Sequence, residues 1–68
     1  MDAKLLTLWH HVESGPVKMS NLSNLLGLSI KQTTRYIHKW HEEGWLIYQS
    51  GVGRGRLSEI EWRRNVER

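Results

Sequence analysis

The sequence contains no cysteine, a single proline and no long apolar run. Without cysteine, neither a disulfide nor a thiolate metal site is possible. The apolar stretches are too short to span a membrane, and the opening segment MDAKLL lacks the basic and apolar regions of a secretion signal. These absences predict a cytoplasmic protein that has no membrane partner.

Sixty-eight residues are enough for one small domain. The net charge of +3 comes from residues 30–56, because basic and acidic side chains balance in the segments before and after them. A localised basic patch indicates a polyanionic partner, and a merely solvated face is the alternative that charge alone leaves open. Four tryptophans are expected to supply much of the core: Trp9, Trp40, Trp45 and Trp62.

Periodic apolar residues predict three helices. Residues 2–13 place apolar side chains at i, i+3, i+4 and i+7, which is one face of an amphipathic helix. A second, short helix is expected at Ser20, whose hydroxyl suits an N-cap, and Gly27 closes it. A third helix spans residues 30–43 after the N-cap Ser29. Its predicted buried face consists of Thr33, Ile37 and Trp40.

The C-terminal part of the chain predicts a β-hairpin. WLIYQS at 45–50 is rich in aromatic and branched residues, and RLSEIEW at 56–62 resembles the returning strand. Leu57 breaks the alternation of the second strand, so a bulge or a shifted register is expected near the turn. Residues 17–19 leave room for one further, very short strand.

A short helix, a glycine turn and a second helix make a helix-turn-helix, and a hairpin directly after them makes its winged form. The predicted fold class is therefore mainly α with a small β-hairpin, a winged helix-turn-helix with three helices and a two-stranded wing. The domain is expected to span residues 1–62, with a polar C-terminal tail at 63–68.

The third helix of such a fold can enter the major groove of DNA, where each base pair presents a distinct pattern. Gln32 can bond an adenine bidentately, and Arg35 and Lys31 can reach guanine or phosphate. Thr34 can hydrogen-bond or contact a thymine methyl, and Ile30 suits a methyl or a sugar. The predicted DNA-binding residues of this helix are Ser29, Lys31, Gln32, Thr34, Arg35, His38 and Lys39.

The segment GVGRGR at 51–56 joins the two predicted strands. A nucleotide-binding loop is excluded, because a strand follows it and the Lys-Ser/Thr pair of such loops is missing. Its glycines allow the positive φ angles that a tight hairpin tip requires. At that tip Arg54 is placed for the minor groove and Arg56 for the flanking phosphate, which completes the predicted DNA-binding site.

Other chemistry has little support in the sequence. His38 and His41 lie at i, i+3 but lack a carboxylate or thiolate partner, so no metal site is predicted. No nucleophile with a neighbouring base is visible, so neither an enzyme nor a bound cofactor is expected. The alternative function is a protein-interaction module without DNA binding, with Trp45 and Trp62 as an apolar docking patch.

The stretch EEGWLIYQSGVGRGRLSEIEW resembles the N-terminal domain of SgrR-type bacterial transcriptional regulators, through its Gly-Trp-Leu segment and its Gly-Arg-Gly turn followed by Ser58. The resemblance extends from about Leu5 to Trp62 and implies a domain that binds double-stranded promoter DNA. In that family, a region similar to the solute-binding proteins of peptide and nickel importers follows, and the resemblance implies this sensor as a partner outside the chain. Thr33 departs from the family, because such helices often carry a larger apolar residue there.

Overall fold

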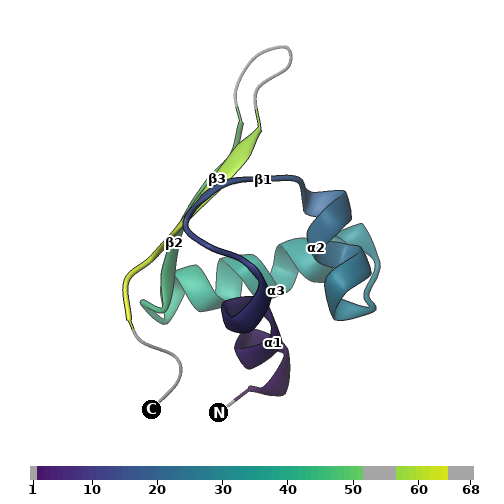
Figure 1. Cartoon of the computed structure of the whole chain (residues 1–68), viewed down its shortest axis with the longest axis horizontal. Coiled ribbons are helices and arrows are strands. Elements are labelled where there is room, and N and C mark those ends of the chain that lie inside the picture. Colours follow the sequence, from purple (N-terminus) through teal and green to yellow (C-terminus); the bar gives the residue numbers. More distant parts are fainter. Residues whose placement is uncertain (1, 52–56, 65–68) are drawn as a thin grey trace.

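A computed structural model of the chain describes residues 2–51 and 57–64. The described part contains three helices and one antiparallel sheet of three strands, which confirms the predicted winged helix-turn-helix (Figure 1). In chain order the elements are α1 (Ala3–His11), β1 (Gly15–Val17), α2 (Met19–Leu26), α3 (Ile30–Glu42), β2 (Leu46–Gln49) and β3 (Ser58–Trp62).

The last strand of the chain is the middle strand of the sheet, in the order β1-β3-β2. β2 pairs with β3 in unbroken antiparallel register from Leu46 opposite Trp62 to Gln49 opposite Glu59. Leu57 precedes β3, so the bulge or shifted register predicted near the turn falls beside residues 52–56, which lie outside the described part. The very short strand exists, but it lies at Gly15–Val17 rather than at residues 17–19.

The boundaries of α1 and α2 follow local capping chemistry. Asp2 is the N-cap of α1, and its carboxylate accepts a hydrogen bond of 2.9 Å from the backbone N–H of Lys4. The expected N-cap role of Ser20 is wrong: α2 begins at Met19, so Ser20 lies inside its first turn, and Lys18 occupies the cap without a side-chain bond. Gly27 closes α2 at a φ of 68°, in the left-handed region that favours glycine, as predicted.

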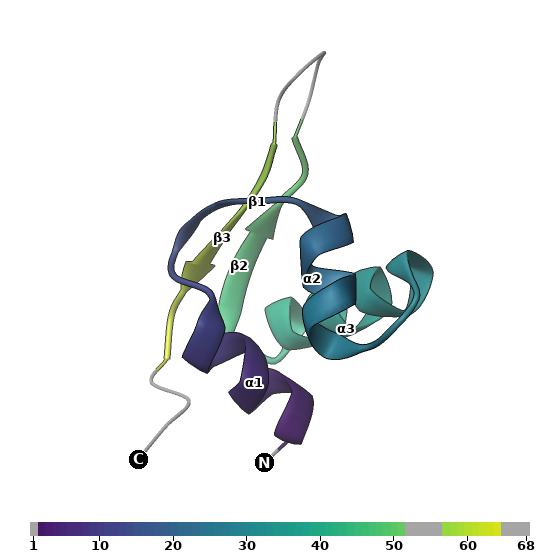
Figure 2. The same ribbon diagram turned by 45° about the vertical axis from the view of Figure 1, so that its right-hand side comes forward.

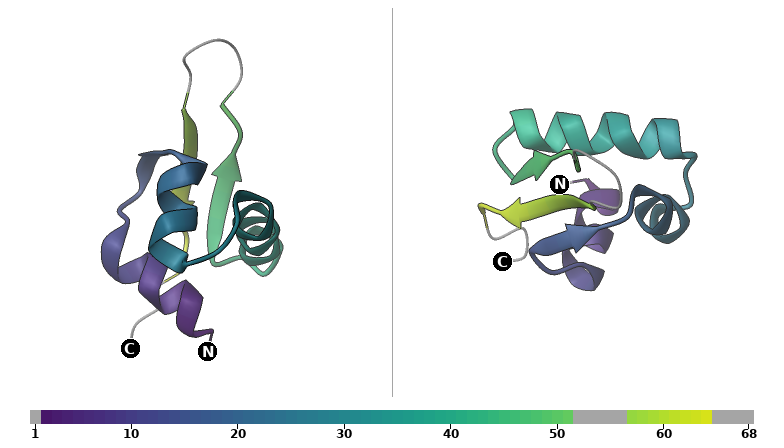
Figure 3. Two further views of the ribbon diagram at one scale, coloured as in Figure 1. Left: turned by 90° about the vertical axis from the view of Figure 1, so that its right-hand side faces the viewer. Right: turned by 90° about the horizontal axis from the view of Figure 1, so that it is seen from above.

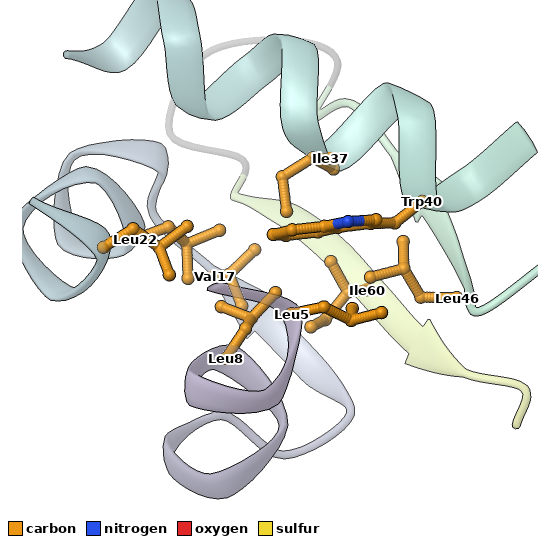
Figure 4. Close-up of a cluster of buried hydrophobic side chains, with 9 residues drawn as sticks. Leu5, Leu8, Val17, Leu22, Ile37, Trp40, Leu46 and Ile60 are labelled. Carbon is orange, nitrogen blue, oxygen red and sulfur yellow. The ribbon is translucent and has the colours of Figure 1, made fainter. Parts of the chain in front are cut away.

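The core lies between α1, α3 and the sheet, with Trp40 in its middle (Figure 4). Trp40 and Ile37 descend from α3, and the predicted third member of this face, Thr33, is also fully buried. The buried apolar residues are Leu5, Leu8, Val17, Leu22, Leu26, Ile37, Trp40, Leu46 and Ile60. Trp40 is the only tryptophan of the chain in this buried set, so the expectation that all four supply the core is only partly correct.

The other three tryptophans are half-buried, and two of them, Trp9 and Trp62, connect α1 to β3. The indole Nε1–H of Trp62 donates to the Val12 carbonyl at 2.9 Å, and its backbone N–H donates to Ser14 Oγ at 2.9 Å. The Trp62 ring meets the Trp9 ring edge to face, with centroids 5.1 Å apart. These contacts, called here the Trp62 clamp, join β3 to α1 and to the segment before β1.

Arg63 and Arg64, which the sequence predicted to lie in the C-terminal tail, contact Trp45 at the start of the hairpin. The backbone N–H of Arg63 donates to the Trp45 carbonyl at 3.0 Å, and the Arg64 guanidinium lies 4.4 Å from the centroid of the Trp45 ring. The second contact is a cation–π interaction. The ordered contacts of the domain therefore reach at least Arg64.

Candidate nucleic-acid interface

Helix α3 lies along one border of the molecule, and α2 packs against its N-terminal half (Figure 2). Seen from above, α3, β2, β3 and β1 follow one another across the domain (Figure 3). Because Thr33, Ile37 and Trp40 are buried, the opposite face of α3 is free to meet a ligand. The predicted site residues on that exposed face are Lys31, Gln32, Arg35, His38 and Lys39.

A capping box fixes the first turn of α3. Ser29 Oγ accepts from the backbone N–H of Gln32 at 3.1 Å. In return, Gln32 Oε1 accepts from the backbone N–H and from the hydroxyl of Ser29, each at 3.3 Å. This reciprocal arrangement satisfies donors that a helix N-terminus otherwise leaves open. Ser29 thus caps the helix as predicted. Gln32 stabilises the same helix end, a role that was not predicted from the sequence.

Both threonines of α3 direct their hydroxyls to the helix backbone. Thr33 Oγ1 donates to the Ser29 carbonyl at 2.8 Å, which satisfies its buried hydroxyl and explains why a polar residue is tolerated in this core. Thr34 Oγ1 donates to the Ile30 carbonyl at 2.9 Å. Ile30 itself is 54% exposed at the first position of the helix, as predicted from the sequence.

Two basic side chains of α3 lie beside Tyr36. Arg35, Tyr36 and Lys39 line a shallow hollow on the surface of the helix. The Lys39 ammonium lies 6.0 Å from the centroid of the Tyr36 ring, and this ring is tilted against Trp40 at 5.4 Å. The buried Trp40 therefore supports Tyr36, which in turn lies beneath the Lys39 charge. Glu42 ends the exposed face with a negative charge, one turn beyond His38.

Tyr48 of β2 connects α3 to the hairpin. Its backbone N–H donates to His41 Nδ1 at 3.0 Å, and its ring meets the His38 ring edge to face at 5.5 Å. Its hydroxyl lies 3.2 Å from Ser58 Oγ on β3. These contacts fix the angle between the helix and both strands of the wing. The sequence carried no signal for them, because they depend on how Tyr48 packs against residues that are seven to ten positions away in the chain.

The two remaining predicted site residues, Arg54 and Arg56, lie outside the described residues, and their roles stay predictions. Within the described part, no group of three or more histidine and carboxylate side chains is placed to hold a metal ion.

Charge divides the described surface into two faces. The exposed face of α3 carries Lys31, Arg35 and Lys39, whereas β3 exposes Glu59 and Glu61. Glu61 is paired with Arg63 at 3.6 Å on the surface, where both side chains are more than half exposed. Arg63 and Arg64 balance the charges of Glu59 and Glu61, whereas the exposed face of α3 keeps an excess of positive charge, which attracts phosphate.

A helix-turn-helix formed by α2 and α3, followed by a hairpin and a basic exposed helix face, defines a winged-helix domain of the transcription-regulator class. The chain belongs to the family described as sugar transport-related sRNA regulator, N-terminal domain, whose sequence profile matches residues 2–68. This match confirms the resemblance to SgrR-type regulators, and it identifies a regulator domain rather than an enzyme. Membership implies a DNA-binding role.

Comparison with curated proteins and with solved structures gave no significant match. Among the described residues, no helix combines the length and the apolar character that crossing a lipid bilayer requires.

Proposed function

We propose that this chain is the promoter-binding domain of a bacterial transcription regulator and acts on double-stranded DNA in the cytoplasm. Helix α3 lies in the major groove, and the Gly-Arg-Gly wing at 51–56 contacts the minor groove or the backbone. The observation that carries the proposal is the exposed face of α3, which presents Lys31, Arg35 and Lys39 opposite a fully buried face.

Each part of the proposed interface has a physical role. The helix dipole and the backbone amides of the first turn that the capping box does not engage attract a backbone phosphate beside Ser29. Lys31 and Arg35 come from the first two turns, which are the part of a recognition helix that reaches base edges. Lys39 and His38 lie further along and suit phosphate contacts, which position the protein without reading the sequence.

The salt dependence of binding tests this proposal. Fluorescence anisotropy with labelled duplexes from a random-oligonucleotide selection should give an affinity that falls linearly with salt on a double-logarithmic plot. Lys39→Ala should flatten that slope by about 0.9, since the phosphate contact proposed for this cation is lost. Arg63→Ala is the matched control, because Arg63 is also an exposed cation but is paired with Glu61 of β3. A folded protein without binding at low salt would overturn the proposal.

The alternative, a protein-docking module, relied on Trp45 and Trp62 as an exposed apolar patch. The Trp62 ring is engaged by Trp9 and by the Val12 carbonyl, and the Trp45 ring is covered by Arg64. These contacts do not favour a docking patch. A partner that is retained by Arg35→Ala, together with an absence of DNA binding, would favour this alternative. A C-terminal sensor region as partner also belongs to the proposal, as an implication of the family resemblance.

A further inference from the structure

The start of α3 has few hydrogen-bond acceptors left for a ligand. Gln32 Oε1 already accepts two hydrogen bonds from Ser29, so the free part of this side chain is its Nε2 donor. Lys31 and Arg35 are donors only. Bidentate binding of adenine by Gln32 requires both the carbonyl and the amide nitrogen, and it would therefore break the capping box.

Ile30 and Thr34 form an apolar patch beside these donors, called here the methyl patch. They are four residues apart on α3 and therefore adjacent on its surface. The Thr34 hydroxyl is turned to the Ile30 carbonyl, which leaves its methyl group as the main part available to a ligand. Ile30 is 54% exposed, and it lies at the end of α3 that is expected to enter the groove. A lone exposed isoleucine is ordinary, but here it continues into a second methyl group among cationic donors.

Donors next to methyl groups match only some of the base edges in the major groove. Thymine presents an acceptor and a 5-methyl group, and guanine presents two acceptors. Adenine and cytosine each present an amino donor, which needs an acceptor from the protein. The chemistry of Ile30, Thr34 and the neighbouring donors therefore fits thymine, with guanine beside it.

We propose that Ile30 and Thr34 contact the 5-methyl group of thymine in the major groove, while Lys31 and Arg35 donate to the acceptors of neighbouring guanine or thymine. This inference rests on the proposed function and specifies which bases the domain selects. The methyl patch thus determines specificity, whereas Gln32 positions the helix N-terminus.

Replacement of thymine by deoxyuridine tests the contact, because it removes the 5-methyl group and leaves the hydrogen-bonding edge unchanged. The best duplex from the random selection is labelled, and each thymine is replaced singly. For the contacted thymine, loss of one buried methyl should weaken binding about fourfold. In Ile30→Ala and in Thr34→Ser the same replacement should have a much smaller effect. Thr34→Ser removes only the methyl and retains the hydroxyl that bonds the Ile30 carbonyl.

Ile47→Ala is the control variant. Ile47 is a partly exposed apolar residue of β2 beside Glu59 and Glu61 and does not belong to α3, so its truncation should leave the deoxyuridine effect intact. Circular dichroism verifies that all three variants are folded. Unchanged affinity for every deoxyuridine duplex, or a selected site without thymine, would overturn the inference and leave the proposed function standing. Failure of the folded protein to bind any duplex would overturn both.

Discussion

Trp62→Phe isolates the energetic value of the Trp62 clamp. The substitution keeps a ring in place but removes the indole N–H that donates to the Val12 carbonyl at 2.9 Å. Loss of that hydrogen bond costs about 1 kcal/mol. The smaller ring also loses part of its edge-to-face contact with Trp9 and part of its buried area, which adds about 1 kcal/mol. The expected loss in the free energy of unfolding is therefore about 2 kcal/mol.

That loss is large for a domain of this size, since folded proteins are stabilised by only about 0.05–0.15 kcal/mol per residue. For domains of about 60–100 residues, 1 kcal/mol shifts Tm by about 4–8 °C, so Trp62→Phe should lower Tm by about 8–16 °C. Urea unfolding followed by circular dichroism measures the free energy directly, without dependence on tryptophan emission.

Trp45→Phe is the matched control, because the Trp45 ring makes a cation–π contact with Arg64 that a phenyl ring can retain. It should cost well under half as much as Trp62→Phe. Equal losses for the two variants, or a loss below about 0.5 kcal/mol for Trp62→Phe, would refute the assignment of the clamp as a main tie between β3 and α1.

Two further predictions concern the helix-turn-helix. Gly27→Ala should destabilise the domain by about 1–2 kcal/mol in urea unfolding, because φ at this position is 68°. An added Cβ meets no atom within 4 Å, so the cost comes from the backbone conformation alone. Unchanged stability of this variant would contradict the prediction. Gln32→Ala should lower the free energy of unfolding by about 1 kcal/mol, because the capping box is lost. Gln32→Glu can restore that box, so its stability should be close to wild type. Its added negative charge should nevertheless weaken DNA binding. Equal stability of both variants would show that the Gln32 side chain does not support the helix.

Local chemistry explains which parts of the fold were predictable. Gly27 and Ser29 mark the turn between α2 and α3, because one tolerates a positive φ and the other caps the following helix. The periodicity of α3 correctly indicated Thr33 as buried, although it is polar. These features depend on a residue and its neighbours within a few positions, and this is the range over which sequence patterns are informative.

The errors arose where distant segments decide the outcome. The position of β1 is set by pairing of Gly15 with Ile60, 45 residues later, and no local propensity reveals that register. Ser20 suited an N-cap as a residue type, but α2 extends past it, and its carbonyl instead accepts from Ser23 Oγ at 2.8 Å. Composition showed that tryptophan is abundant, but it did not show that only Trp40 would be fully buried.

The candidate site was predictable as a set of residue types, but not in how those side chains are engaged. The sequence placed Gln32, Thr34 and Arg35 on the outer part of a helix, whereas the hydrogen bonds of Gln32 and Thr34 to the backbone and to Ser29 emerge only from the structure. These bonds change which atoms remain free to read a base. The contacts of Tyr48 with His38 and His41 of α3 were not predicted, for the same reason.

β3 is the last of the described strands and also the middle strand of the sheet, so the sheet cannot form until β3 has been synthesised. Until residues 58–62 have left the ribosome, β1 and β2 have no strand to pair with, and Trp9 has no Trp62 beside it. Without β3, Ile60 is missing from the core that α1 and α3 share, so part of their apolar surface stays uncovered. A nascent chain that stops before Ser58 therefore lacks the middle strand of the sheet and the contact of Trp62 with α1.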